Sequence, residues 1–411
     1  MVDVGERIAQ LRSPTASKGT YYDYRSFRND ARITWNFDVG GPDPATFPVD
    51  DLSRLAEQVL RDESARALQY GTLEHADLSY GYVGVREEIA ERTLRREGRA
   101  TEIMQVMLTS GGVQALTLAC RAFLAPGDVM AVEAPTWGAV LHAATQLGAE
   151  ALAIPMDAEG MRVDVLEAEL ARLAQEGRAL KMLYTIATFN TPTGLCLSLP
   201  RRLRLLELAD EYGFIVLEDD VYGELRYEGD DLPTLYSLDE TGLVIKVNSF
   251  SKTLAPALRL GWVTGHPDAI ATLGSVRGDL GVSQWLARLM ARYLSEGLLD
   301  QHLAEIKGLY RNKRDVAAAA LRERCGAWVD FRVPDGGFFL WIELSNDVDG
   351  AAVMKAAAAE GVDCRPGERF FGASEQDQHK QWFRLAYSLV PIDEIERGIT
   401  ALGKAIANSI R

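Results

Sequence analysis

The sequence predicts an α/β fold: a large domain built on a mostly parallel seven-stranded sheet sandwiched by helices, plus a smaller α+β C-terminal domain. Two observations predict the sheet. From about residue 104 to residue 264, short apolar or β-branched runs alternate with longer segments of helical period. The runs are almost continuously apolar, which indicates strands buried on both faces and hence mostly parallel pairing. A third observation predicts the smaller domain, because after Ser275 the pattern changes to long helices.

Seven apolar runs predict the seven strands of the sheet. They cover residues 104–108, 129–133, 151–155, 181–186, 214–217, 244–247 and 260–263. Between the first two runs, an apolar stripe at helical spacing predicts a helix that starts near Val113 and is closed by Pro126 and Gly127. Residues 201–212 predict another helix, which ends at Gly213. Right-handed crossovers between such strands bring functional loops to the carboxyl ends of the strands.

The C-terminal part of the chain combines helical and strand-like segments. Alanine-rich helical turns at residues 317–320 and 356–359 alternate with strand-like runs at residues 336–344 and 382–388. This mixture predicts the smaller α+β domain.

The composition excludes several classes of protein. The 411 residues include 44 Lys+Arg against 59 Asp+Glu, a formal net charge of -15 at pH 7, which repels a nucleic-acid backbone. No apolar run reaches the roughly eighteen residues of a membrane-spanning helix, and the first residues lack the apolar core of a signal peptide. The cysteines form no CxxC pair and the histidines show no ligand spacing. We therefore expect a cytoplasmic protein without nucleic acid, membrane or metal as a partner.

The segment SFSKTLAPALRLGW, residues 249–262, follows a predicted buried strand. Its Lys252 can lie in a partly desolvated position, where a lysine amine is a nucleophile that forms Schiff bases. Ser249, Ser251 and Arg259 supply hydroxyl donors and a fixed cation, a combination suited to a phosphate group. On this segment alone, a surface lysine is an equally good interpretation.

Two more segments add chemistry at strand ends. Ser110, Gly111 and Gly112 follow the first strand and begin a helix, whose free N–H groups can bind phosphate, although the same residues also suit a plain tight turn. Asp219 follows shortly after the predicted strand at residues 214–217, and Tyr222 lies three residues further on. The carboxylate can pair with a cationic heteroaromatic nitrogen, or it can be a helix cap or a solvated loop residue. Together, lysine, phosphate cup and carboxylate describe a site for pyridoxal 5'-phosphate (PLP), whose ring is an electron sink.

In these segments and others, the sequence resembles the fold-type I PLP-dependent aminotransferases of class I/II, in particular the α-aminoadipate and kynurenine aminotransferase branch. The resemblance runs from about Ile33 to the C-terminus. The motifs that carry it are GGPDPATFP, QYG, GYVGVREEIA, TSGGVQAL, EAPTWGAVL, FNTPTG, LEDDVYGEL, SFSKTLAPALRLGW, GGFFLWIEL and FRLAYS. The large domain is then expected to bind PLP.

The resemblance implies a role for each matching residue. Lys252 would hold PLP as an aldimine and shuttle a proton, Asp219 would keep the pyridine nitrogen protonated, and Tyr222 would hydrogen-bond the phenolic oxygen together with Thr191. The residues expected to bind the phosphate are Ser110, Gly111, Gly112, Ser249, Ser251, Arg259 and, from the neighbouring subunit, Tyr70. The residues expected to complete the site are Trp137 stacked on the ring, Arg384 on the substrate carboxylate and Gly40 near the substrate.

The resemblance also implies a homodimer with shared active sites. We predict that the chain has three parts, the first set apart because the first fifty residues show little periodicity. Residues 1–50 form an N-terminal segment that covers the active site or dimer interface. Residues 51–290 form the large PLP-binding domain, and residues 291–411 form the small C-terminal domain.

Three departures from the family pattern stand out. Thr191 stands where the family has Asn, and Asn190 lies one place earlier. Gly112 and Val113 replace residues with hydroxyl and amide side chains. The segment 72–80 is longer than usual; its His75, Asp77 and Tyr80 are candidates for substrate recognition or belong to a plain surface loop, and the extra length leaves open whether Tyr70 or Tyr80 contacts the phosphate.

The leading hypothesis for the function is an aminotransferase that moves the α-amino group of an amino acid to a 2-oxo acid through a Lys252 aldimine and pyridoxamine phosphate. The alternative is a PLP-dependent lyase, cyclase or β/γ-replacement enzyme on the same scaffold, which Thr191 and the long segment 72–80 favour modestly. A regulator that binds PLP without turnover is the third hypothesis. We expect it least, because such regulators carry an N-terminal DNA-binding domain and this chain is strongly acidic.

Overall fold

The structure is a computed structural model that describes residues 33–372 and 379–410. Its central sheet has eight strands in the order β2-β9-β8-β7-β6-β3-β4-β5. The strands are β2 (Val106–Thr109), β3 (Val129–Ala134), β4 (Glu150–Asp157), β5 (Gly160–Met161), β6 (Leu180–Thr185), β7 (Ile215–Asp219), β8 (Val244–Ser249) and β9 (Gly261–Thr264). The seven predicted strands are all present. The two-residue β5 was not predicted, because so short an element has no periodicity.

The sheet is mostly parallel, as expected. Strands β4, β3, β6, β7 and β8 are parallel to one another. Strand β9 lies between β8 and β2 and is antiparallel to both, and β5 is antiparallel to β4. The carboxyl ends of the parallel strands therefore lie at one edge, where β3, β6, β7 and β8 deliver the loops of the candidate site.

Helices cover both faces of the sheet, because successive side chains of each strand point to opposite faces. Met130 and Val132 of β3 belong to one hydrophobic cluster, and Val129 and Ala131 belong to another. The helices of the first face are α5 (Val83–Glu97), α6 (Gly112–Phe123), α12 (Pro267–Ser275) and α13 (Gln284–Ser295), and those of the second are α8 (Val163–Gln175) and α9 (Leu199–Tyr212). Helix α7 (Gly138–Leu147) packs against β4 and α6. Helix α9 ends at Gly213, as predicted, in a left-handed conformation with φ +70°.

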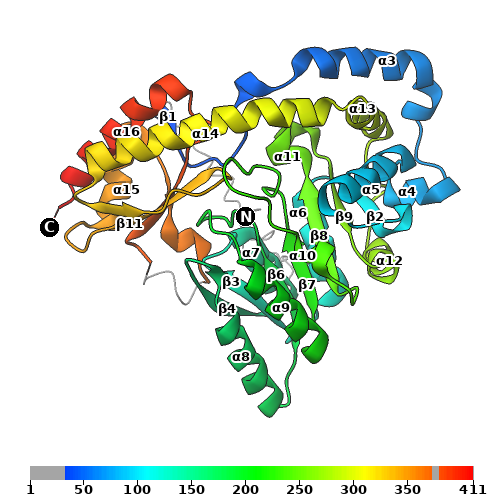
Figure 1. Cartoon of the computed structure of the whole chain (residues 1–411), viewed down its shortest axis with the longest axis horizontal. Coiled ribbons are helices and arrows are strands. Elements are labelled where there is room, and N and C mark those ends of the chain that lie inside the picture. The colour runs from blue at the N-terminus through cyan, green and yellow to red at the C-terminus, as the bar shows by residue number, and fades with distance from the viewer. Residues whose placement is uncertain (1–32, 373–378, 411) are drawn as a thin grey trace, which may run out of the picture.

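The smaller domain is built on a second, antiparallel sheet in the order β10-β11-β14-β13. Its elements are β10 (Val329–Phe331), β11 (Phe339–Leu344), β13 (Arg365–Pro366), β14 (Trp382–Ala386), α15 (Gly350–Ala359) and α16 (Ile392–Ala407). The 28-residue helix α14 (Leu298–Cys325) spans both cores, since Leu303 packs in the main cluster and Leu321 in the smaller one. Figure 1 shows this helix running along the top of the molecule beside α16. The predicted boundaries at residues 50 and 290 stay predictions.

The first described residues join the smaller domain. Strand β1 (Trp35–Asn36) pairs in parallel with β12 (Val362–Asp363), and Phe37 packs in the smaller core. Residues 1–32 of the predicted N-terminal segment lie outside the described residues. We call residues 37–43 the strap, because they lead from β1 past the candidate site towards α3 (Val49–Ala67). The short helices are α4 (Asp77–Tyr80), α10 (Leu235–Leu238) and α11 (Phe250–Thr253).

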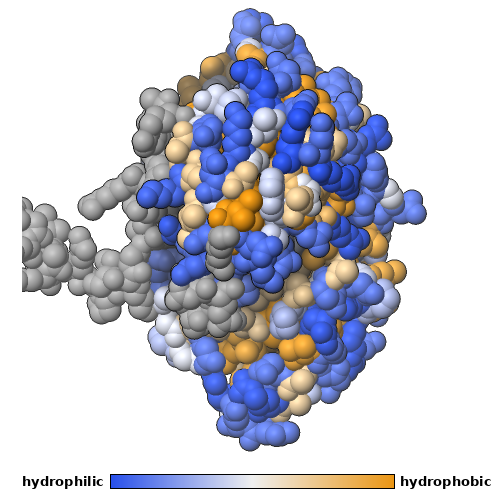
Figure 2. All heavy atoms as spheres, turned by 90° about the vertical axis from the view of Figure 1, so that its left-hand side faces the viewer, coloured by the Kyte–Doolittle hydropathy of each residue, from blue (hydrophilic) through white to orange (hydrophobic). Residues whose placement is uncertain are grey.

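The side of the molecule seen in Figure 2, on which the smaller domain lies, is mostly hydrophilic over the described residues, with apolar side chains in small separate patches. This is consistent with the acidic composition. Among the helices in the described part of the chain, none is long and apolar enough to cross a membrane.

Candidate active site

Lys252 lies on the short helix α11, directly after β8, and reaches the strap. Its Nζ donates a hydrogen bond of 2.6 Å to the carbonyl of Gly40 and lies 5.7 Å from the centre of the Tyr222 ring. Burial and then the nearby guanidinium of Arg384 lower the pKa of Lys252 to about 8, against the opposing charge of Asp219. A substantial fraction of the amine is therefore neutral near pH 8, as a nucleophile or a base requires.

Asp219 ends β7 and is 3% exposed. Its Oδ2 accepts a hydrogen bond of 2.8 Å from the hydroxyl of Tyr184, whereas its Oδ1 is buried without a hydrogen-bond partner. Burial raises the pKa of Asp219 to about 6, although the Tyr184 hydroxyl, the backbone N–H of Val221 and the Lys252 charge lower it. An unpaired buried carboxylate oxygen is costly, so this atom indicates a missing cationic or N–H partner.

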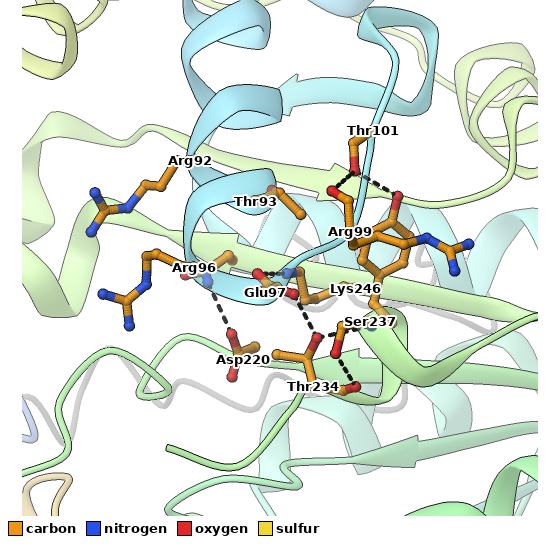
Figure 3. Close-up of polar contacts among 12 residues, drawn as sticks. Arg92, Thr93, Arg96, Glu97, Arg99, Thr101, Asp220, Thr234, Ser237 and Lys246 are labelled. Atoms are coloured by element: carbon orange, nitrogen blue, oxygen red, sulfur yellow. Dashed lines mark hydrogen bonds and ion pairs between the residues drawn. The ribbon is translucent and has the colours of Figure 1, made fainter. Parts of the chain in front are cut away.

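Asp220, the next residue, belongs to a different environment (Figure 3). Its Oδ2 accepts a hydrogen bond of 3.3 Å from Asn248 Nδ2. It lies beside the buried ion pair of Lys246 and Glu97, and Glu97 also accepts a hydrogen bond of 2.6 Å from Thr234. Burial and the charge of Glu218 raise the pKa of Asp220 well above its usual range. Asp220 is therefore not the equivalent of Asp219.

Tyr222 and Thr191 lie close together on neighbouring loops. Burial raises the pKa of the Tyr222 hydroxyl to about 12, while the charge of Arg384 lowers it. The Thr191 hydroxyl itself is buried and makes no hydrogen bond. The adjacent Asn190 donates to Glu133 at 2.7 Å and accepts from Thr193 Oγ1 at 2.9 Å. Thr191 is therefore the side chain that this loop offers to the site, and Asn190 does not substitute for the missing amide.

The predicted phosphate cup is assembled from three loops. Gly111 precedes α6 as a residue with φ +84° and no capping side chain, so the first N–H groups of the helix remain open. Arg259 donates to the carbonyl of Ser110 at 2.9 Å. Ser249 Oγ accepts a hydrogen bond of 3.1 Å from the backbone N–H of Ser251 and donates to its hydroxyl at 2.9 Å. Open N–H groups, two hydroxyls and a guanidinium thus meet at one end of α6, a combination that binds an anion.

Arg384 lies on β14 and is buried. Its Nη2 donates to the carbonyl of Asp38 in the strap at 2.5 Å. Its guanidinium lies 4.2 Å from the ring centre of Phe339 and 5.1 Å from that of Phe370. Gly40 is needed where it stands, because a Cβ there would lie 2.4 Å from Phe339 Cε1. The strap and the smaller domain thus bring a cation and aromatic rings to the site.

For two of the predicted site residues, Trp137 and Tyr70, the structure gives the surroundings and the exposure of the side chain. Trp137 precedes α7 as its N-cap residue and is half-buried against the main core. Tyr70 is 74% exposed and lines a surface groove of about 960 Å³ formed by residues 67–71 and 280–285. Neither observation tests the role that the resemblance implies for them.

The longer segment 72–80 contributes fewer recognition residues than its composition suggested. Asp77 is buried and paired with Arg86 at 3.3 Å. Tyr80 is buried in the main core, where the Arg86 guanidinium lies over its ring. The structure therefore uses both side chains to anchor the segment, and of the three candidates only His75 remains exposed.

Sequence reasoning missed two buried residues, Tyr184 and Glu133. Tyr184 binds Asp219, and Glu133 accepts hydrogen bonds from Thr185 Oγ1 at 2.7 Å and from the Ile186 N–H at 3.0 Å. A polar residue within an apolar strand was the available signal, since each lies near the carboxyl end of a predicted parallel strand.

The residues present fit PLP. The unpaired Oδ1 of Asp219 suits a protonated ring nitrogen, the unpaired Thr191 hydroxyl and Tyr222 suit a phenolic oxygen, and the cup at α6 suits a phosphate. Within residues 33–372 and 379–410, no three His, Cys, Asp or Glu side chains gather in a way that could hold a metal ion.

Comparison with known proteins agrees with this chemistry. Residues 37–402 match the family described as Aminotransferase class I and II. The chain is 38% identical to aromatic-amino-acid aminotransferase 1 of Thermococcus litoralis, over 90% of this chain and 88% of that protein. It is 33% identical to 2-aminoadipate transaminase of Thermus thermophilus, over 90% and 89% of the two chains. Among solved structures, a Pyrococcus horikoshii kynurenine aminotransferase in complex with PMP superposes with a TM-score of 0.91 at 34% identity, covering 99% of both chains. The chain therefore belongs to the class I and II aminotransferases and is a PLP-dependent enzyme of transamination.

Proposed function

We propose that this enzyme transfers the amino group of an aromatic or similarly bulky apolar amino acid to a 2-oxo acid such as 2-oxoglutarate, with Lys252 as the residue that carries PLP. The observation that carries the proposal is the convergence of the Lys252 amine, the unpaired Asp219 carboxylate oxygen and the Arg384 guanidinium on one site. PLP, when bound, supplies an electron sink for negative charge that develops at the amino acid Cα.

In this proposal Lys252 also acts as a base. Its amine accepts the proton of the donor Cα, and the low pKa of about 8 keeps part of the amine neutral at working pH. The carbonyl of Gly40, 2.6 Å from Nζ, orients the amine. Asp219 stays ionised above about pH 6. Its unpaired Oδ1 would face the ring nitrogen.

The cofactor is held at its other end by the cup of Ser110, Gly111, Gly112, Ser249, Ser251 and Arg259. Tyr222 and Thr191 would donate to the phenolic oxygen, and Trp137 would stack on the ring. A threonine hydroxyl offers one donor, where the amide of the family pattern offers two.

Arg384 binds the donor α-carboxylate through its planar guanidinium. The rings of Phe339 and Phe370 that flank it make this part of the site apolar and favour an aromatic donor. The names of two relatives, an aromatic-amino-acid and a kynurenine aminotransferase, support the same donor class.

The enzyme is further proposed to be a homodimer with shared active sites. Apolar side chains are unusually exposed next to Tyr70, with Leu68 at 71% and Leu73 at 87%. Leu68, Leu280 and Trp285 line the groove together with Tyr70, and Leu73 lies three residues after Tyr70 along the chain. Such a surface supports contact with a second copy, which would bring Tyr70 to the phosphate of the neighbouring site.

A single-turnover screen of amino acids tests the donor class. We expect phenylalanine, tyrosine and tryptophan to convert bound PLP to pyridoxamine phosphate fastest, with release of the corresponding 2-oxo acid, and 2-oxoglutarate to restore PLP. Faster conversion by 2-aminoadipate or glutamate would overturn the aromatic preference. Borohydride reduction followed by peptide mapping tests the lysine, and a label on a peptide without Lys252 would overturn that assignment.

A further inference from the structure

Tyr184 is a completely buried tyrosine whose hydroxyl binds Asp219 of the candidate site. It lies on β6, where it pairs with Leu217 of β7, two residues before Asp219. Because side chains two residues apart lie on the same face of a strand, Tyr184 and Asp219 project from the same face of the sheet. The Tyr184 hydroxyl donates to Asp219 Oδ2 at 2.8 Å.

The neighbouring carboxylate does not compete for this hydroxyl. Glu133 is the other acid close to Tyr184, and it accepts hydrogen bonds from Thr185, Ile186 and Asn190. Burial raises the pKa of Tyr184 well above 10, and the charges of Asp219 and Glu133 raise it further. The hydroxyl therefore remains protonated and remains a donor at any working pH.

The two oxygens of Asp219 are consequently different. Oδ2 is held by Tyr184, and Oδ1 is buried with no partner. One anchored oxygen fixes the plane of the carboxylate and leaves the other available, which is the arrangement that a preorganised partner for a ring nitrogen needs. Without Tyr184 the carboxylate could rotate, and both oxygens would lack a side-chain donor.

We propose that Tyr184 is a positioning residue, which holds Oδ2 of Asp219 so that Oδ1 is presented, ionised, to the ring nitrogen of PLP. This inference rests on the proposed role of Asp219 and assigns a new role to a residue behind it. Tyr184 contacts neither the substrate nor the cofactor in this proposal.

The experiment measures PLP affinity of the apoenzyme between pH 5 and pH 8.5 by fluorescence titration, so that turnover is not needed. The groups that interact with Asp219 across this range are Tyr184 of β6, Glu133 of β3, Glu218 of β7, Lys252 of α11 and Tyr222. Tyr184→Phe removes only the hydroxyl. The matched control is Tyr236→Phe, another buried tyrosine, whose hydroxyl lies 3.2 Å from Thr101 Oγ1 and away from the site.

In the wild type, affinity is expected to fall as pH drops through about 6, where Asp219 takes up a proton. Loss of the Tyr184 hydrogen bond raises the pKa of Asp219, so in Tyr184→Phe this fall moves to higher pH by about one unit. Affinity at neutral pH then decreases by about twofold, the deficit grows to about tenfold at pH 5, and affinity recovers towards the wild-type value at pH 8.5. Tyr236→Phe keeps the wild-type profile. A wild-type profile in Tyr184→Phe would overturn the proposal.

Asp219→Asn separates this inference from the proposed role of Asp219. If the affinity of Asp219→Asn does not fall near pH 6 and Tyr184→Phe behaves as the wild type, only the role of Tyr184 is wrong. If the PLP affinity of Asp219→Asn still falls as pH drops through about 6, the proposed role of Asp219 is wrong as well. A measurement on the unaltered apoenzyme covers the case that Tyr184→Phe does not fold. With ¹³Cζ-labelled tyrosine, one resonance should shift with a midpoint near pH 6 and lose that shift in Asp219→Asn; no such resonance would contradict the inference.

Discussion

At the scale of single residues, Asp219 and Asp220 are chain neighbours with different surroundings. Asp219 faces Tyr184 and Lys252 with one oxygen unpaired, whereas Asp220 faces Asn248 beside the ion pair of Lys246 and Glu97. The pKa of Asp219 rises to about 6 and leaves it ionised at neutral pH, whereas the pKa of Asp220 rises well above its usual range. Only the first is suited to pair with a cation.

Asp219→Asn is expected to bind PLP and lose most of its turnover, because a neutral amide does not keep the ring nitrogen protonated. Removal of one preorganised electrostatic group costs about 3 kcal/mol, or at least about a hundredfold in rate. Steady-state kinetics with a good donor measures the loss. Asp220→Asn is the matched control and should keep kcat within a few-fold. If Asp220→Asn lost more turnover than Asp219→Asn, the two roles would be exchanged.

Lys252→Met should stabilise the apoenzyme at neutral pH. The folded pKa of about 8 lies below the usual 10.5, so between these values the unfolded state binds more protons and wild-type stability rises with pH. Below pH 8 the buried charge costs the folded state up to about 3 kcal/mol, which methionine removes. Urea unfolding at pH 7 and pH 10.5 measures the difference, which should disappear at the higher pH. A variant less stable than the wild type at pH 7 would contradict this.

Arg384→Ala should weaken binding of the amino donor by about 2 to 5 kcal/mol, because the donor carboxylate loses its charged partner. The PLP content should remain that of the wild type, since no proposed contact to the cofactor is removed. The Michaelis constant of the donor and the absorbance of bound PLP check these two expectations. Arg384→Lys keeps the charge but lacks the planar guanidinium, so its Michaelis constant for the donor should lie between those of the wild type and Arg384→Ala. An unchanged Michaelis constant would place the carboxylate elsewhere.

At the scale of elements, the strap and the start of α6 position the site. Arg384 donates to the Asp38 carbonyl, the Ser388 hydroxyl donates to the Gly41 carbonyl at 2.6 Å, and Lys313 pairs with Asp43 at 2.6 Å. These contacts hold the strap against the smaller domain and α14. The carbonyl of Gly40 is thereby kept at the amine of Lys252.

The first turn of α6 depends on Gly111 more than on Gly112. Gly111 has φ +84°, and a Cβ there would lie 2.6 Å from Arg259 Nη2. Gly111→Ala should therefore destabilise the apoenzyme by more than about 1 kcal/mol and weaken PLP binding. At Gly112 the nearest atom to a Cβ would be 3.7 Å away, so Gly112→Ala, the control, should change stability by less than about 1 kcal/mol. Urea unfolding and PLP titration compare the two, and equal effects would contradict the argument.

At the scale of the whole molecule, helix α14 joins the main core to the smaller core, and the described residues include an exposed apolar surface next to Tyr70. Helix α14 packs in the main core near its start and in the smaller core near its end. The mostly hydrophilic side of the molecule seen in Figure 2 contrasts with the exposed Leu68, Tyr70 and Leu73. The contrast predicts which surface a second copy covers.

The enzyme is therefore expected to sediment as a dimer at assay concentration. Leu73→Asp places a charge on the exposed apolar surface and should shift the protein towards monomer, with loss of activity because Tyr70 no longer reaches a neighbouring site. Leu203→Asp is a control on an exposed leucine of α9, outside this surface. A fully active monomer of the wild type would contradict the shared active site.

The sequence by itself determined the strands, the fold class and the family. It also placed Lys252, Asp219 and the turn at Gly111 and Gly112 close to strand ends. The reason is that a strand buried on both faces is a local run of apolar residues, and the motifs lie within a few residues of these runs. The alternation of buried runs and helices also predicted a mostly parallel sheet.

Only the tertiary structure decided the strand order, with β9 antiparallel between β8 and β2, and the contacts that complete the site. Arg384 meets Asp38 across 346 positions, and Lys252 meets Gly40 across 212. The sequence left open whether Asp77 and Tyr80 face a substrate; packing placed them against Arg86. Likewise, in the sequence Tyr184 is one residue of an apolar strand, and its contact with Asp219 exists only because β7 lies beside β6. Periodicity describes neighbours along the chain, whereas such contacts depend on which distant faces pack together.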